Sequence, residues 1–223
     1  MTTLVIDCSN CSGEISAEQA KGLYAAGVRE AVVQIVNEHV LTHRQQIPVL
    51  QAAGIEVSGY VYVWFSAGPE WAADRVRWAA TELARYTAPN QTMLWLDCEQ
   101  SDHDDPPFDY IHQLTSPTIR GCIQAVEEYG FRPGIYTAAW WWFPGTSNST
   151  EFSDLPLWNA NYDLDPDIDP VDYGGWAVPK MEQYQPNTSL AGVPMIDLNS
   201  VLGTTKSRDE RLKELLEKAL ALL

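Results

Sequence analysis

Short apolar segments alternate with helix-length amphipathic segments up to about residue 137, and this alternation restricts the fold more than any other feature of the sequence. Runs such as Leu4–Asp7, Ala31–Val36 and Met93–Asp97 are rich in aliphatic residues and have the length of strands. Between them lie segments with helical start and stop signals, such as the Ser16/Gln19 capping box and the closing Gly27. The pattern predicts an α/β fold with a largely parallel sheet.

We expect eight strands, with full helical crossovers only in the first half of the chain. Further helices are expected from Thr42, from Pro69 and from Ser116-Pro117. Turns, prolines and acidic loops separate the last strands. The expected strands are Leu4–Asp7, Ala31–Val36, Ser58–Phe65, Met93–Asp97, Gly134–Thr137, Leu157–Ala160, Met181–Tyr184 and Met195–Leu198.

Composition excludes several classes of protein. The chain has 223 residues, 45% of them hydrophobic, which is enough for a sizeable core without disulfides. Its net charge of −16 would repel phosphate backbones, so we expect no nucleic-acid partner. The sequence contains no run of 18 apolar residues, so we expect no membrane span. The N-terminus has no basic segment or small-residue cleavage site, so we expect no signal peptide.

Four acidic side chains occupy related positions along the expected strands. Asp7, Asp97 and Asp197 stand at or near expected strand ends, and Glu99 follows Asp97 by two residues, on the same side of the strand. In an αβ barrel, the carboxyl ends of the strands build the active site. Converging carboxyls repel, so at least one should keep its proton at neutral pH, as a general acid must. A single such acid would be read as a turn or cap residue.

Six segments carry a family resemblance: Ile6–Ser9, Trp95–Glu99, Pro133–Thr137, Leu157–Tyr162, Glu182–Tyr184 and Gly192–Asn199. In order and spacing they resemble glycoside hydrolase family 25, the N-acetylmuramidase lysozymes common among phage endolysins. The resemblance covers about residues 3–203. It implies an irregular TIM-like (β/α) barrel of eight strands and about five helices, with helices missing in the second half. A catalytic barrel is expected over residues 1–205.

The resemblance also implies roles for individual residues. Glu99 corresponds to the general acid, and Asp97 to its partner, which stabilises positive charge or orients the 2-acetamido group of the substrate. Asp7 and Asp197 correspond to further carboxylates of the site. Four aromatic residues are placed where rings could stack on sugars: Tyr62, Tyr136, Trp158 and Tyr184.

The implied function is hydrolysis of the β-1,4 bond between N-acetylmuramic acid and N-acetylglucosamine in bacterial cell-wall peptidoglycan, with no cofactor. The alternative is a non-catalytic glycan-binding or virion-associated structural module on the same barrel. The acid set favours the enzyme, whereas the charge of −16 favours the alternative, because cell walls are often anionic. Action on the wall implies release by a phage route such as a holin, a place in the virion, or an extracellular location.

Two sequence features suggest metals, and each has a simpler interpretation. Cys8 and Cys98 follow inward-facing aspartates, so alternation turns them toward the helices, where thiols act as small hydrophobic groups rather than zinc ligands. The acidic segment Asp163–Asp172 lacks the glycine and glutamate of a calcium loop, which favours a solvated loop over a weak calcium site. We therefore expect no metal site.

The segment Trp140–Trp142 is compatible with an exposed sugar platform or with a buried cap of the barrel. Residues 206–223 are predicted to form a separate C-terminal helix. Leucines and alanines recur there at helical steps behind a Ser207/Glu210 capping box. This amphipathic helix is expected either to pack on the barrel or to serve for docking to a partner or self-association.

Overall fold

A computed structural model describes residues 4–36, 40–99 and 108–201, with the backbone alone for residues 108–113. The helix expected over residues 206–223 lies outside the described residues, as does the expected end of the barrel at residue 205.

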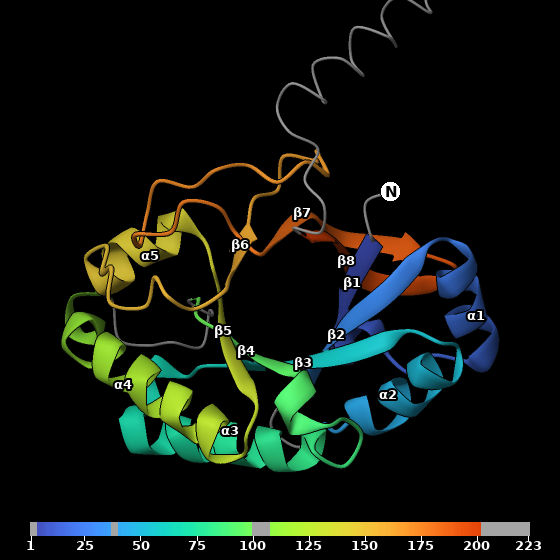
Figure 1. Cartoon of the computed structure of the whole chain (residues 1–223), viewed down its shortest axis with the longest axis horizontal. Coiled ribbons are helices and arrows are strands. Elements are labelled where there is room, and N and C mark those ends of the chain that lie inside the picture. The colour runs from blue at the N-terminus through green and yellow to red at the C-terminus, as the bar shows by residue number, and fades with distance from the viewer. Residues whose placement is uncertain (1–3, 37–39, 100–107, 202–223) are drawn as a thin grey trace, which may run out of the picture.

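Eight strands close into one barrel, in the order of the sequence (Figure 1). Neighbouring strands from β1 to β7 are parallel, whereas β8 is antiparallel to both β7 and β1. The predicted barrel of eight strands, largely parallel, is therefore confirmed. The strands are β1 (Leu4–Cys8), β2 (Val28–Val36), β3 (Glu56–Tyr62), β4 (Met93–Asp97), β5 (Arg132–Thr137), β6 (Leu157–Ala160), β7 (Met181–Leu190) and β8 (Val193–Val201).

Five α-helices flank the barrel, and within the described residues none follows β6. Most contacts of α1 to α4 with the sheet fall on β2 to β5, and within the described residues no helix connects β6 to β7 or β7 to β8 (Figure 1). In the described part of the chain, no helix is both long and apolar enough to cross a membrane. The helices are α1 (Ala17–Ala25), α2 (His43–Ala52), α3 (Pro69–Leu83), α4 (Phe108–Glu128) and α5 (Ala139–Thr146), with 3₁₀ turns at Asn10–Ser12, Phe65–Ala67 and Pro89–Gln91.

Two helical predictions are corrected by the structure. The helix expected from Ser116-Pro117 begins at Phe108, so Pro117 lies inside α4 rather than at its start. Buried side chains at 115, 118, 119 and 122 form one stripe across the proline, and this packing outweighs the local start signal. The short helix α5 was not predicted, because its sequence is apolar almost throughout and shows little helical periodicity.

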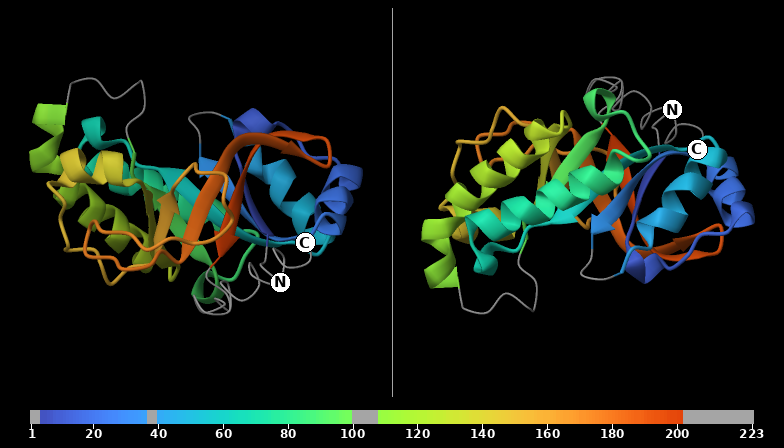
Figure 2. Two further views of the ribbon diagram at one scale, coloured as in Figure 1. Left: turned by 90° about the horizontal axis from the view of Figure 1, so that it is seen from above. Right: turned by 90° about the horizontal axis from the view of Figure 1, so that it is seen from below.

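Helix α1, near the start of the chain, contacts the turn between the last two strands, β7 and β8. The predicted capping box of this helix is present, with Ser16 and Gln19 bonded reciprocally. The Gln19 Nε2 also donates to the carbonyl of Gly192, 2.6 Å away, in the β7–β8 turn. Gly22 lets this turn approach, since a Cβ there would lie 2.9 Å from the Ala191 Cβ. The β7–β8 hairpin consequently lies beside α1 (Figure 2).

Two apolar clusters fill the molecule. The larger lies between sheet and helices and contains the buried thiols Cys8, Cys98 and Cys122, which confirms that alternation turns Cys8 and Cys98 away from the barrel lumen. Trp141 and Trp142 are buried in the same cluster, whereas Trp140 is 59% exposed, so the segment is neither wholly exposed nor wholly buried. The smaller cluster fills the lumen and is built around Trp95, Tyr136 and Trp158.

Glu182 of β7 organises the helix-free connection between β6 and β7. Its carboxylate is fully buried and accepts hydrogen bonds from the side-chain amides of Asn159 (3.2 Å) and Asn161 (3.3 Å). The backbone N–H of Asp169 donates to the same group. One buried carboxylate thus satisfies donors from β6 and from two points of the loop, which replaces the packing that a crossover helix would supply.

We expect Glu182→Gln to destabilise the fold by about 1–3 kcal/mol, because the new NH2 group would face amide donors without an acceptor. The free energy of unfolding in urea measures this. The exposed Glu127→Gln on α4 is the control and should stay within about 0.5 kcal/mol of the wild type. Equal effects of the two substitutions would contradict the role assigned to Glu182.

Candidate active site

The structure gathers the four predicted acids at one rim of the barrel. Asp7 and Asp97 lie at the carboxyl ends of β1 and β4, and Glu99 follows the end of β4 by two residues. Asp7 is the register partner of Asp197 across the β1–β8 ladder. The negative charge of another of these acids raises the pKa of Asp7, of Asp97 and of Glu99.

The expectation that Asp197 stands near a strand end is wrong. It lies in the middle of β8, which runs antiparallel to β1 and extends from Val193 to Val201. Because the strand is reversed, its middle meets the carboxyl end of β1. Asp197 therefore reaches the same rim as the other acids by a different route.

A buried amide joins two of the acids. The Nε2 of Gln183 donates to Asp7 Oδ2 and to Asp197 Oδ2, both at 2.9 Å. The Nδ2 of Asn199 donates to the same Asp7 oxygen at 2.8 Å. Tyr136 completes the network, since its hydroxyl donates to Gln183 Oε1 at 2.8 Å. Strands β1, β5, β7 and β8 are thus linked through side chains inside the lumen.

Burial raises the pKa of Asp7 well above its usual range, and the negative charge of Asp197 raises it further. Burial also raises the pKa of Asp197, although the backbone N–H of Asn187, 2.6 Å from Oδ1, favours its charged form. The two carboxyls are coupled. The proton is therefore held more tightly by Asp7, the more deeply buried member, and the negative charge resides more on Asp197.

The second acid pair is Asp97 and Glu99. Burial, then the charges of Glu99 and Asp7, raise the pKa of Asp97 well above its usual range. Burial, then the charge of Asp197, raise the pKa of Glu99 to about 7. Glu99 is partly exposed at the rim, whereas Asp97 is only 6% exposed below it. A carboxyl that still holds a proton near neutral pH therefore borders solvent.

Asp97 has an unused acceptor. Among the described residues, nothing donates a hydrogen bond to its buried Oδ1, and the buried Nε1 of Trp95 on the same strand also lacks a partner there. Room for the Trp95 ring comes from Gly134 on β5, where a Cβ would lie 2.4 Å from that ring. Buried polar atoms are rarely left unpaired. An oxygen and an N–H in this state are suited to a bound polar ligand.

The four predicted aromatic residues lie at different depths. Tyr62 is half-buried at the rim, and its hydroxyl donates to the Glu99 carbonyl at 3.0 Å. Tyr136 is buried within the network, with its hydroxyl 3.2 Å from that of Tyr162. Tyr184 is half-buried on β7. Trp158 is 2% exposed and forms the floor, with its ring centroid 4.6 Å from that of Tyr136.

Sequence reasoning missed three site residues: Gln183, Asn199 and Tyr162. The alternation that placed Glu99 beside Asp97 also places Asn199 on the face of Asp197, so this residue could have been found. Gln183 lies within the segment Glu182–Tyr184, but a lone glutamine carries no chemical signal that would predict its role. Tyr162 follows β6 in an irregular segment, for which the sequence offers no side-chain direction.

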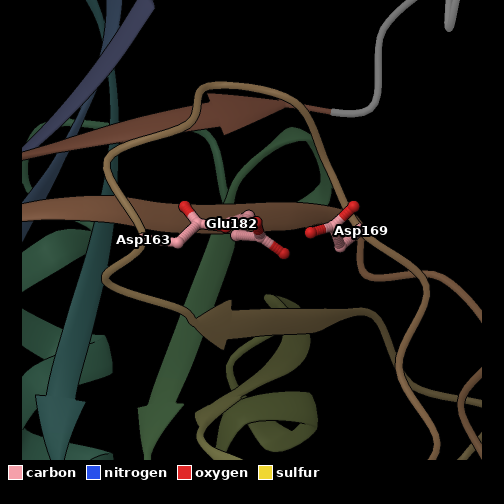
Figure 3. Close-up of side chains that lie close together, drawn as sticks. All are labelled: Asp163, Asp169 and Glu182. Carbon is pink, nitrogen blue, oxygen red and sulfur yellow. The ribbon is translucent and has the colours of Figure 1, made fainter.

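One group of side chains has the composition of a cation site. Asp163, Asp169 and Glu182 offer carboxylate oxygens within 4.8 Å of one another (Figure 3). Two of the three are exposed, and the third is the buried Glu182 whose oxygens already accept amide hydrogen bonds. The position of these carboxylates is therefore explained by the hydrogen bonds through which Glu182 holds the acidic loop Asp163–Asp172.

Comparisons with known proteins show which family the chain resembles. The sequence profile described as glycosyl hydrolases family 25 matches residues 6–193. A protein of Dictyostelium discoideum named probable GH family 25 lysozyme 4 is 32% identical over 150 residues, which cover 66% of this chain and 66% of the relative. Matches to several other curated relatives span between about a third and a half of their lengths.

Solved structures share the fold. The bacterial lysozyme of Streptomyces coelicolor superposes with a TM-score of 0.72 at 19% identity, covering 92% of this chain and 94% of that one. The family GH25 lysozyme of Aspergillus fumigatus gives a TM-score of 0.66 at 18% identity, covering 95% and 99%. The profile match spans most of the barrel and includes Asp7, Asp97 and Glu99, so the chain belongs to glycosyl hydrolases family 25.

Proposed function

We propose that this protein is a peptidoglycan hydrolase that cleaves the β-1,4 bond between N-acetylmuramic acid and N-acetylglucosamine. The observation that carries the proposal is the pair formed by Glu99 and Asp97. One is a rim carboxyl with its pKa raised to about 7, and the other is a buried carboxyl with an unused acceptor oxygen. Membership of the family supports the same activity.

Glu99 is the general acid in this proposal. Cleavage of a glycosidic bond needs a proton on the leaving oxygen and negative charge near an oxocarbenium-like centre. A carboxyl with a pKa near 7 is protonated in a useful fraction at neutral pH and remains acidic enough to give the proton away. The Tyr62 hydroxyl holds the backbone of Glu99 by its bond to the carbonyl, which fixes the acid relative to β3.

Asp97 orients the substrate. Its free Oδ1 accepts the N–H of the 2-acetamido group, so that the acetamido carbonyl oxygen faces the anomeric carbon and attacks it as the leaving oxygen takes the proton of Glu99. A donated hydrogen bond favours the charged form of Asp97. Substrate binding thus leaves Asp97 negative and the proton on Glu99. This attack closes a ring between the acetamido group and the anomeric carbon. Water then opens the ring, with Glu99 as the base.

The remaining acids support this pair. Asp197 raises the pKa of Glu99 by its charge, and Gln183 holds Asp197 in place. The partners of the protein are accordingly the glycan strands of the bacterial wall. Delivery to the wall, by a phage route or from outside the cell, stays a prediction from the sequence.

Glu99→Gln should lower the rate of wall hydrolysis by at least about 10²-fold, because the amide keeps the shape but has no acidic proton. Clearing of a purified wall suspension measures the rate, and analysis of new reducing ends identifies the bond. New N-acetylmuramic acid ends support the proposal. N-acetylglucosamine ends, or near-normal clearing by the variant, would contradict it. Wall binding without any cleavage by the wild type would favour the non-catalytic module.

The rate should also depend on pH with a defined sign. Because Glu99 must carry its proton, kcat/KM should fall as the pH rises through about 7. Rates on soluble glycan fragments between about pH 5 and pH 9 test this. A descending limb that stays unchanged in an Asp197→Asn variant would contradict the electrostatic role of Asp197, which predicts a shift of that limb to lower pH.

The free energy of unfolding tests the raised pKa of Glu99 without an activity measurement. The folded pKa of Glu99 lies above the value of about 4.3 for an unfolded glutamate. Its contribution to stability is therefore present below about pH 4 and is lost as the pH rises to about 7. Glu99→Gln should gain stability relative to the wild type between about pH 5 and pH 8, as measured by urea unfolding. A constant difference over this range would contradict the raised pKa.

A further inference from the structure

An aromatic ladder rises along β3 from the barrel floor to the outer rim. Tyr60, Tyr62 and Trp64 alternate with the fully buried Val61 and Val63, which face the helices. Tyr60 packs against Trp158 on the floor, with ring centroids 6.2 Å apart. The period of two along an extended chain therefore directs all three aromatic side chains to the lumen side.

The ladder continues beyond the strand onto α3. The ring of Trp64 lies 6.5 Å from that of Tyr62 and 5.3 Å from that of Trp71, in the first turn of α3. The two ring planes are inclined by 33° at this centroid distance, so the indoles pack against each other in a tilted, overlapping pair and Trp64 supports Trp71 from one side. Trp71 is 44% exposed. An indole pair with this exposure is open to a ligand from solvent.

Arg75 fixes the two indoles from the protein side. Its guanidinium carbon lies 5.0 Å from the centroid of Trp64 and 5.6 Å from that of Trp71. The arginine is only 9% exposed and also donates to the Val36 carbonyl at 3.4 Å. The buried cation therefore fixes both indoles against the protein, while Trp71 keeps 44% of its surface open to solvent.

The ladder is tied to the acid pair through the backbone. The N–H of Val63, between Tyr62 and Trp64, donates to the Asp97 carbonyl at 2.9 Å. The Tyr62 hydroxyl donates to the Glu99 carbonyl. These two hydrogen bonds therefore fix the position of Trp64 relative to the carboxyls of Asp97 and Glu99. Trp71 adjoins Trp64 on the side of α3.

We propose that Trp64 and Trp71 form a sugar-stacking subsite that binds a pyranose ring of the glycan strand beyond the scissile bond. The apolar C–H face of a pyranose is flat and neutral, so it can cover an open indole in a protein of strong negative charge. The inference rests on the proposed function for its occupant, because a polymeric substrate extends past the two sugars at the acids. The subsite makes the enzyme selective for long strands.

Binding is measured on a Glu99→Gln background, which prevents cleavage. The probes are N-acetylglucosamine oligomers of increasing length, titrated by calorimetry. Adding Trp71→Ala should weaken the longest oligomers by about tenfold and leave the shortest unchanged, as expected for loss of an aromatic anchor at the end of the site. Trp71→Phe keeps a smaller ring and should lose less.

Tyr129→Ala is the matched control, since Tyr129 is a similarly exposed aromatic residue (39%) that precedes β5, at the opposite end of the barrel from the acids. It should leave all affinities unchanged. Thermal unfolding of each variant confirms that the fold is kept. Equal affinities of the Trp71→Ala and control proteins at every length, or no binding of any oligomer, would overturn the subsite.

Kinetics separate the subsite from the chemistry. On long strands, Trp71→Ala in the otherwise wild-type chain should raise KM with kcat nearly unchanged, the pattern of lost uniform binding. A fall in kcat on the shortest cleavable fragment would overturn the assignment. Failure of the wild type to cleave any glycan would count against the proposed function, whereas length-dependent binding lost with Trp71 would uphold the subsite independently.

Discussion

The hydrogen bonds from one amide group, the Nε2 of Gln183, hold the site together. A closed barrel keeps water out of its lumen, and a carboxylate buried there is costly unless donors face it. Gln183 donates to both Asp7 and Asp197, while Asn199 and Tyr136 fix the orientation of Asp7 and of the amide itself. These residues come from β1, β5, β7 and β8, so the network exists only once the barrel has closed. Closure by β8 and assembly of the site are the same structural event.

The same burial creates a conflict between stability and chemistry. Desolvation is the largest cause of the raised pKa of Asp7, Asp97, Glu99 and Asp197. Each of these acids would destabilise the fold in its charged form, and their mutual repulsion adds to the cost. Proteins retain such groups where perturbed protonation is useful. Glu99 borders solvent at the rim, and its pKa comes to about 7, where proton donation at neutral pH is possible.

Periodicity predicted the parts of this protein that depend on local sequence. The strands Met93–Asp97 and Leu157–Ala160 have the predicted bounds, and the Ser16 capping box is present. The reversal of β8 was not predictable in this way, because an alternating pattern reads the same in either direction. Asp197 was therefore included for a wrong reason, and Gln183, whose role depends on pairing across β7, β8 and β1, was missed. The start of α4 at Phe108 shows the same limit, since long-range burial overrode the proline signal.

Binding and chemistry share one backbone junction in this fold. The carboxyl ends of β3 and β4 are parallel neighbours, with Tyr62 paired to Asp97. A hydrogen bond from Val63 to the Asp97 carbonyl extends this pairing beyond the end of β3. Because side chains alternate, the residues on either side of Val63 lie on the same side of the sheet as Asp97 on β4. Any shift of β3 against β4 would therefore displace the aromatic ladder relative to the acid pair. The helix α3 and its Arg75 hold the outer end of the ladder, so the strands that position the acid pair also fix the place of Trp64 and Trp71.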